Sequence, residues 1–211
     1  MGFKFGPVYP ILDVSYLPAT GRAAFLERLG GAMADAEVAL MEYRNKTESD
    51  AQVLADARIL RTAMPLTTLV MDDRVDVALA AKFNGVHVDS GDLPVGVARS
   101  LLGPDAIVGT SASSEAELTG ALKSGVDYIA FGPVYPTTTK QTSVTPIGID
   151  GVRRFRELAG VGPVLVAAAG ITLETAPAIV EAGANAVAVS GAIFRAQDPA
   201  TEFRRWMDVL G

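Results

Sequence analysis

The chain has 211 residues, no cysteine and a formal net charge of −6 at pH 7. The lack of cysteine excludes disulfides and thiolate metal sites, and the negative charge argues against a nucleic-acid partner. No apolar run reaches the roughly 18–20 residues that a membrane span needs, and the N-terminal residues do not resemble a secretory signal, so we expect a cytoplasmic protein with no membrane partner.

Short apolar segments with the length of buried strands alternate with segments that carry apolar residues at helical spacing. The predicted strands span residues 8–13, 38–43, 66–71, 85–88, 106–110, 128–131, 164–168 and 186–190. The predicted helices span residues 22–33, 51–63, 75–83, 95–102, 114–122, 150–158, a stretch ending near 181, and 199–209. Eight such pairs favour an α/β fold, a single (β/α)8 TIM barrel over residues 1–211, with an open doubly wound sheet as the alternative.

The stretch DYIAFGPVYPTTTK, residues 127–140, joins the sixth predicted strand to a loop rich in hydroxyl groups. Thr137, Thr138, Thr139 and Lys140 could present hydroxyls, backbone N–H groups and one cation to a phosphate. An ordinary strand-to-helix connection can have the same composition, so the residues alone leave the two interpretations close to even.

Charged residues gather where the predicted strands end, which is where the catalytic residues of TIM barrels lie. Glu42, Arg44 and Lys46 would share one side of the second strand if that strand extends so far. Two cations at that place would offset the overall negative charge for an anionic ligand, although charged strand exits are more often simply solvated. His87, the only histidine, lies between valines, and we expect it to line the mouth of the barrel, with no acid–base role assigned.

Oxygen donors and small residues follow several of the other strands. Asp72 and Asp73 come after the third strand, where they could cap a helix, and Asp92 comes after the fourth. One or two carboxylates together with substrate phosphates is the usual way in which proteins hold Mg²⁺. Loops after the seventh and eighth strands often bind phosphate in such barrels, which draws attention to Gly170, Ser190 and Gly191.

Taken in order, these motifs resemble the thiamine phosphate synthase family over nearly the whole chain. The string GPVYPTTTK, residues 132–140, is similar to the family's phosphate-binding loop. Further matches are Arg44, Lys46, Asp73, Arg74, His87, Asp92, Ser111 and Gly170. The chain departs from the family pattern at Glu42 for Gln, Asp72 for Asn, Asp89-Ser90-Gly91 for Gly-Gln-Glu, and Ala169 for Gly.

The resemblance implies a transferase that condenses hydroxymethylpyrimidine diphosphate with thiazole phosphate through a pyrimidine cation, giving thiamine phosphate and pyrophosphate. It implies Lys140, Ser111 and Arg44 as catalytic residues, and Asp73 and Asp92 as ligands of an Mg²⁺ cofactor. The substrate-binding residues that it implies are Glu42, Tyr43, Arg44, Asn45, Lys46, Asp72, Ser111, Thr137, Thr138, Thr139, Lys140, Gly170, Ser190 and Gly191.

Two other functions stay open for a barrel of this kind. One is a thiazole phosphate isomerase of similar fold, which would need neither a diphosphate-holding lysine nor a pair of metal carboxylates. The other is a barrel that binds a thiamine precursor without turning it over, which the departures at Glu42, Asp72, Asp89 and Ala169 favour. An unrelated phosphate-binding barrel would leave the 137–140 string unexplained. The oligomeric state is open, a homo-oligomer included, and we expect residues 140–149 to form a flap over the site.

Overall fold

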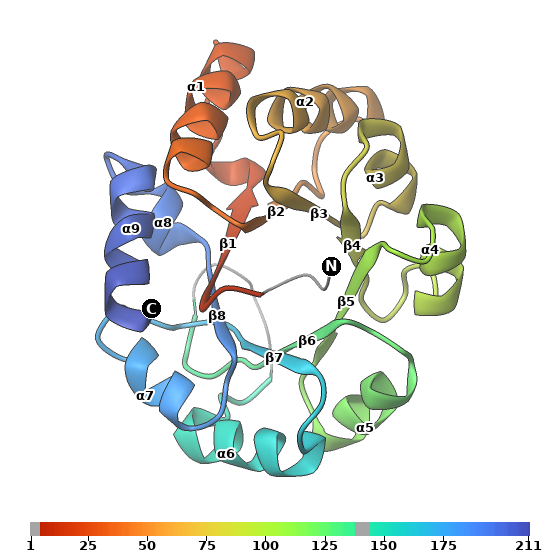
Figure 1. Cartoon of the computed structure of the whole chain (residues 1–211), viewed down its shortest axis with the longest axis vertical. Helices are drawn as coiled ribbons and strands as arrows, with labels where there is room; N and C mark the ends of the chain where they lie inside the picture. Colours follow the sequence, from red (N-terminus) through yellow and green to blue (C-terminus); the bar gives the residue numbers. More distant parts are fainter. Residues whose placement is uncertain (1–4, 138–143) are drawn as a thin grey trace.

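The computed structural model describes residues 5–137 and 144–211 and contains a closed barrel of eight parallel strands (Figure 1). The strands are β1 (Val8–Asp13), β2 (Leu40–Arg44), β3 (Thr68–Asp72), β4 (Gly85–His87), β5 (Ile107–Ala112), β6 (Tyr128–Phe131), β7 (Val164–Ala167) and β8 (Ala186–Val189). They follow chain order around the barrel, and β8 closes it by pairing with β1, Val8 opposite Val187. The (β/α)8 prediction is confirmed, and the open sheet is wrong because the sheet has no free edge.

The helices form a ring around the barrel (Figure 1). They are α1 (Arg22–Asp35), α2 (Asp50–Ala63), α3 (Val75–Ala81), α4 (Val95–Leu102), α5 (Glu115–Lys123), α6 (Gly148–Ala159), α7 (Ala176–Glu181), α8 (Gly191–Phe194) and α9 (Pro199–Leu210). Two short elements lacked a sequence signal because neither is long enough to show periodicity: α8 and the 3-10 helix η1 (Val14–Tyr16). No helix in the described ranges is long and apolar enough to cross a membrane.

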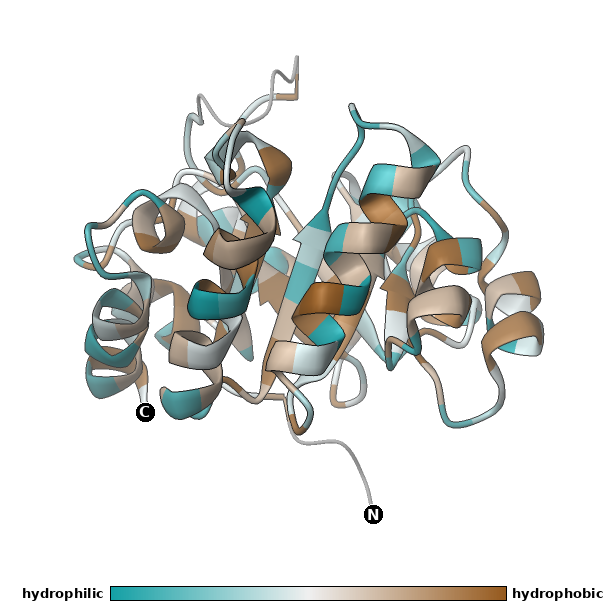
Figure 2. Ribbon diagram, turned by 90° about the horizontal axis from the view of Figure 1, so that it is seen from above, coloured by the Kyte–Doolittle hydropathy of each residue, from teal (hydrophilic) through white to brown (hydrophobic). Residues whose placement is uncertain are grey.

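Apolar residues fill both the space between strands and helices and the lower half of the barrel interior. The interior cluster consists of Tyr9, Leu40, Val70, Ile107, Tyr128, Val166 and Ala186, with Phe5 packed against it. In Figure 2 the barrel is seen from the side, with strand arrowheads towards the upper rim. Because the interior is plugged below, only the carboxyl ends of the strands are left to form a site, and we call that end the barrel mouth.

Gly109 of β5 shows how tightly this interior is packed. A Cβ atom at Gly109 would lie 2.0 Å from Cζ of Tyr128, whose side chain is fully buried. The glycine therefore leaves room for the tyrosine ring in the centre of the barrel.

We expect Gly109→Ala to lower the free energy of unfolding by at least ~2 kcal/mol, because the buried ring has no free space to move into. Gly31→Ala is the matched control, since Gly31 lies inside α1 with nothing within 4 Å of an added Cβ. Removing that helical glycine should raise stability by about 0.5–1 kcal/mol. Urea unfolding of both variants measures the difference, and equal effects would contradict the packing described here.

Candidate functional site

Most residues predicted from the sequence as site residues lie at the barrel mouth. The structure describes thirteen of the predicted site residues, whether or not they lie at the mouth: Glu42, Tyr43, Arg44, Asn45, Lys46, Asp72, Asp73, Asp92, Ser111, Thr137, Gly170, Ser190 and Gly191. Thr138, Thr139 and Lys140 lie outside the described residues, as do residues 140–143 of the expected flap.

The two cations of β2 and its loop lie among three carboxylates. Asp13 of β1 and Arg44 of β2 are register partners, and their side chains form an ion pair. Arg44 Nε also lies 3.5 Å from Asp72 Oδ2, and Lys46 Nζ lies 3.4 Å from the same oxygen. Lys46 Nζ approaches Asp73 Oδ2 to 2.7 Å. The cations are thus held in place, but their charge is largely balanced before any anionic ligand binds.

Tyr43 and Asn45 require a correction, because their side chains do not reach the mouth. Strand alternation turns Tyr43 outward, where its hydroxyl donates to Asp56 of α2 at 2.5 Å. Asn45 Nδ2 donates to the Tyr43 hydroxyl at 2.9 Å, and Asn45 Oδ1 accepts from the backbone N–H of Glu48 at 3.2 Å. These residues support the loop that carries Lys46, so the expected substrate contacts are not available to their side chains.

Asp73 and Asp92, the predicted magnesium ligands, lie close to each other. The pKa of Asp92 is raised by partial burial and by the neighbouring charge of Asp73. Asp73 Oδ1 is buried without a hydrogen-bond partner among the residues that the structure describes. No group of three or more His, Cys, Asp or Glu side chains in those residues could hold a metal ion. The pair therefore fits a cation that takes its other ligands from water and substrate phosphate, as Mg²⁺ does.

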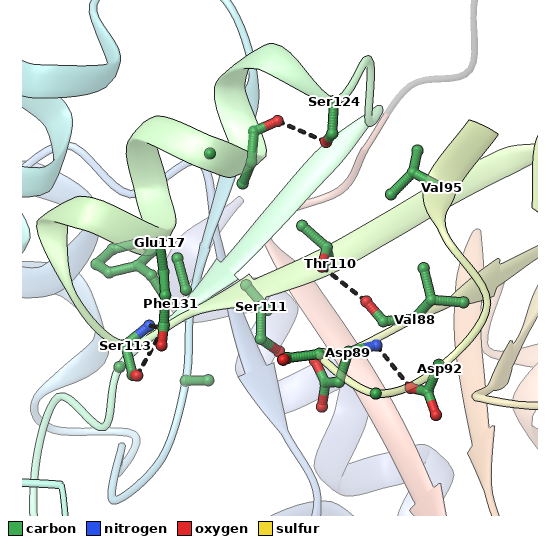
Figure 3. Close-up of a pocket in the computed structure, with 18 of the residues that line it drawn as sticks. Val88, Asp89, Asp92, Val95, Thr110, Ser111, Ser113, Glu117, Ser124 and Phe131 are labelled. Carbon is green, nitrogen blue, oxygen red and sulfur yellow. Dashed lines mark hydrogen bonds between the residues drawn. The ribbon is translucent and has the colours of Figure 1, made fainter.

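A cavity of about 690 Å³ is lined by β5, by α5 and by the loops after β4, β6 and β7. Asp92, Ser111, Thr137 and Ala169 all contribute to its wall. Figure 3 shows Ser111 and Asp89 lying near each other on adjoining elements, with Asp92 on the loop after β4. The cavity thus joins a predicted metal ligand to the start of the predicted phosphate loop, and its volume is typical of ligand sites.

The loops after β6 and β7 pack against each other through their backbones. Val134 N donates to Ala168 O at 2.9 Å, and Tyr135 N donates to Ala169 O at 3.2 Å. Gly170 has a φ of 69°, and a Cβ there would lie 2.6 Å from the carbonyl oxygen of Tyr135. A glycine is needed at this position because the two loops approach so closely.

Ser190 and Gly191 lie where β8 passes into α8. The Ser190 hydroxyl donates to Ile11 O of β1 at 2.6 Å. Its side chain thus ties β8 to β1, so the contribution that we expect from this corner to a phosphate comes from the backbone.

Sequence reasoning missed a set of hydrogen-bonded side chains inside the barrel. Tyr9 Oη donates to Glu42 Oε2 at 2.6 Å and lies 2.7 Å from Tyr128 Oη. His87 Nδ1 lies 3.0 Å from Tyr128 Oη, and His87 Nε2 lies 2.9 Å from Ser111 Oγ. The sequence offered only one sign of this set, the positions of Tyr9 and Tyr128 within apolar strands. Tyrosines at such positions ordinarily predict packing in the core.

Several ionisable groups around this set are shifted. Burial alone would lower the pKa of His87, but the hydrogen bond to Asp89 and the charges of Glu42, Asp89 and Asp72 raise it to about 9. Burial raises the pKa of Glu42, against the opposing effect of His87. Burial, and then the charge of Glu42, raise the pKa of Asp72 to about 7. The buried end of the site thus favours protonated forms.

Asp72→Asn should stabilise the protein in metal-free buffer as the pH rises. A carboxyl whose folded-state pKa lies above its usual value contributes fully below about pH 4, and loses that contribution as the pH passes about 7. We expect the variant's advantage in the free energy of unfolding to grow over this window to about 2–4 kcal/mol.

Urea unfolding at pH 5 and pH 8 measures this difference. The exposed Asp76 is the matched control, because Arg74 lowers the pKa of its carboxyl, so that Asp76→Asn should slightly lose stability above pH 4. An Asp72→Asn variant whose free energy of unfolding at pH 8 does not exceed that of the wild type would contradict the raised pKa of Asp72.

Comparisons with known proteins show the family of the chain. The family model described as thiamine monophosphate synthase matches residues 8–193. A thiamine-phosphate synthase of Koribacter versatilis is 38% identical, over 89% of each chain, and that of Agrobacterium fabrum is 37% identical, over 94% of this chain and 90% of its own. The solved thiamine phosphate pyrophosphorylase from Pyrococcus furiosus is 30% identical, covers 97% of this chain and 96% of its own, and superposes with a TM-score of 0.80. The chain therefore belongs to the thiamine monophosphate synthase family of transferases.

Proposed function

We propose that the protein is a thiamine-phosphate synthase that joins hydroxymethylpyrimidine diphosphate to thiazole phosphate and releases pyrophosphate. The observation that carries the proposal is the single cavity whose wall includes both Asp92 and Thr137. A diphosphate at the Asp92 end and a phosphate at the Thr137 end would lie side by side in it. Two bound substrates held in this way gain most of the advantage of an intramolecular reaction.

Charge balance supports an Mg²⁺ requirement. Arg44 and Lys46 already face Asp13, Asp72 and Asp73, so a diphosphate would meet little net positive charge from these side chains. Asp73 and Asp92 would hold the Mg²⁺ ion, which when bound supplies positive charge to the diphosphate oxygens. Both carboxylates lie within the negative mouth, where a divalent cation is favoured.

The chain's own residues would then act by positioning and electrostatics. Arg44, Lys46, Ser111 and Lys140 would stabilise the pyrophosphate as the bond from the pyrimidine methylene carbon to oxygen breaks. The lone pair of the thiazole nitrogen would form the new bond to that carbon. Since this nitrogen carries no proton to remove, no general base is needed. Thr137, Thr138, Thr139, Gly170 and the backbone of Ser190 and Gly191 would hold the thiazole phosphate.

Glu42 and Asp72 set this chain apart from the family pattern and favour the second candidate, a barrel that binds the precursors without turnover. Their carboxylates add negative charge beside a polyanionic substrate. The isomerase alternative gains no such support, because it explains neither carboxylate of the proposed metal pair. The substrates are small metabolites, so we also propose a cytoplasmic location and no nucleic-acid partner.

A coupled assay for pyrophosphate release tests the proposal. With both substrates and Mg²⁺ present we expect turnover, and without metal we expect none. Lys46→Ala and Lys140→Ala should each lower the rate about 100-fold, because each removes a cation from the developing pyrophosphate charge. Lys123→Ala is the matched control, since Lys123 is an exposed residue at the end of α5 and should leave the rate unchanged.

Binding of thiazole phosphate without any pyrophosphate release would exclude the synthase and favour the binding barrel. Turnover that persists without metal would overturn the role proposed for Asp73 and Asp92.

A further inference from the structure

A hydrogen-bonded chain crosses the barrel interior from β2 to β5. It runs from Glu42 to Tyr9, Tyr128, His87 and Ser111, with heavy-atom distances of 2.6, 2.7, 3.0 and 2.9 Å. The exposed fractions are 3% for Glu42, 1% for Tyr9, none for Tyr128 and 6% for His87. Only the last member, Ser111, is exposed, and it opens into the substrate cavity. One end of the chain is therefore sealed in the barrel and the other faces the ligand.

The direction of the hydrogen bond at Ser111 depends on where the hydrogens of the chain reside. Each tyrosine hydroxyl has one hydrogen to donate. If Glu42 is ionised, Tyr9 donates to it, Tyr128 donates to Tyr9, and His87 Nδ1 donates to Tyr128. Asp89 Oδ1, 3.3 Å from Nε2, favours a second ring hydrogen on Nε2, and with that hydrogen in place Nε2 donates to Ser111.

A second arrangement holds the same number of hydrogens. If the proton resides on Glu42, the carboxyl donates to Tyr9, Tyr9 to Tyr128, and Tyr128 to His87 Nδ1. Neutral His87 then has its only ring proton on Nε2, which again donates to Ser111. The two arrangements differ by the shift of one proton along the chain, and Ser111 Oγ accepts in both.

The surroundings of Nε2 agree with a donor at this position. Asp89 Oδ1 lies 3.3 Å from Nε2 on the cavity side. An ionised carboxylate can only accept, so this oxygen also favours a hydrogen on Nε2. Ser111 Oγ makes no other hydrogen bond among residues 5–137 and 144–211 that the structure records. Its own hydrogen is therefore left to point into the cavity.

We infer that this buried chain makes Ser111 a hydrogen-bond donor to an anionic oxygen in the cavity, with Glu42, Tyr9, Tyr128 and His87 as positioning residues that act through it. The inference deepens the proposed function, on which it rests for the identity of the anion as the diphosphate of one substrate. It also gives Glu42 a role that requires no contact with the substrate.

Energetic cost favours this role over simple packing. Burying polar groups stabilises a barrel less than apolar residues of similar volume would, unless every group is paired. Strand interiors of TIM barrels are usually filled by branched apolar residues, as at Val70 and Val166 here. A chain of paired polar groups that ends at the cavity is explained by the orientation of Ser111.

A double-mutant cycle tests the inference through the affinity for inorganic pyrophosphate, measured by calorimetry in buffer with MgCl₂. Tyr9→Phe and Tyr128→Phe each delete one hydroxyl from the chain with little change of shape. With the chain broken, His87 loses part of the hydrogen bonding that fixes its ring and its hydrogens against Ser111, so we expect each variant to weaken binding several-fold. Ser111→Ala should weaken it by at least as much.

The decisive comparison is the combined variants. Adding Tyr9→Phe or Tyr128→Phe to Ser111→Ala should cause no further loss, because the chain acts only through Ser111. Tyr43→Phe is the matched control, because it deletes a buried tyrosine hydroxyl bonded to Asp56, outside the chain. Whatever fold-change Tyr43→Phe causes in the dissociation constant for pyrophosphate, the double variant with Ser111→Ala should show the product of the two single fold-changes.

The inference would be overturned if the fold-changes of Tyr9→Phe and of Tyr128→Phe each multiplied with that of Ser111→Ala. It would also be overturned if Tyr9→Phe and Tyr128→Phe alone both bound pyrophosphate as tightly as the wild type. A wild type that binds no pyrophosphate would overturn it as well. Thermal unfolding shows which variants are folded, and two chain tyrosines allow the cycle to be completed if one variant does not fold. Turnover is measured separately, so a protein that binds pyrophosphate in this pattern but forms no product would contradict the proposed function and leave the inference standing.

Discussion

The concentration of carboxylates at one end of the barrel is the constraint on which the site depends. Asp13, Asp72 and Asp73 come from the ends of β1 and β3, and parallel strands in register bring them to Arg44 and Lys46. The same ion pairs that hold the two cations in place also reduce the charge that they can offer to a ligand. A polyanion can bind there only with additional positive charge, and this is the reason for which we propose a divalent cation at the acidic mouth.

The barrel itself could be predicted closely from the sequence, because hydrophobic periodicity and chain order are local signals. Strand boundaries shifted by up to two residues, as at Leu40 and Thr68, since apolar residues continue into the preceding turns. Alternation predicted that Glu42 and Arg44 share one side of β2, and their contacts with Tyr9 and Asp13 agree with that. Tyr43 points to the other side of β2, where its hydroxyl contacts Asp56 and Asn45, so the side-chain contacts that the resemblance implies for these two residues are not available.

The interior chain could not be predicted in the same way. Tyr9 and Tyr128 are far apart in the sequence and meet only because β1 and β6 face each other across a closed barrel. The space that Tyr128 occupies depends on the missing side chain of Gly109, a relation that no local pattern reveals. His87 was expected at the mouth and is buried beneath Ser111, and this link required the register of β4 with β5.

Anomalous diffraction from crystals grown with Mn²⁺ and pyrophosphate would test most directly whether the acidic mouth binds its anion through a metal. Mn²⁺ prefers the same oxygen ligands as Mg²⁺ and can be located by its scattering. We expect one strong peak within coordinating distance of Asp73, Asp92 and pyrophosphate oxygens, with Lys46 moved from Asp73 to the anion. Pyrophosphate bound to Arg44 and Lys46 with no metal between it and the carboxylates would contradict the central claim.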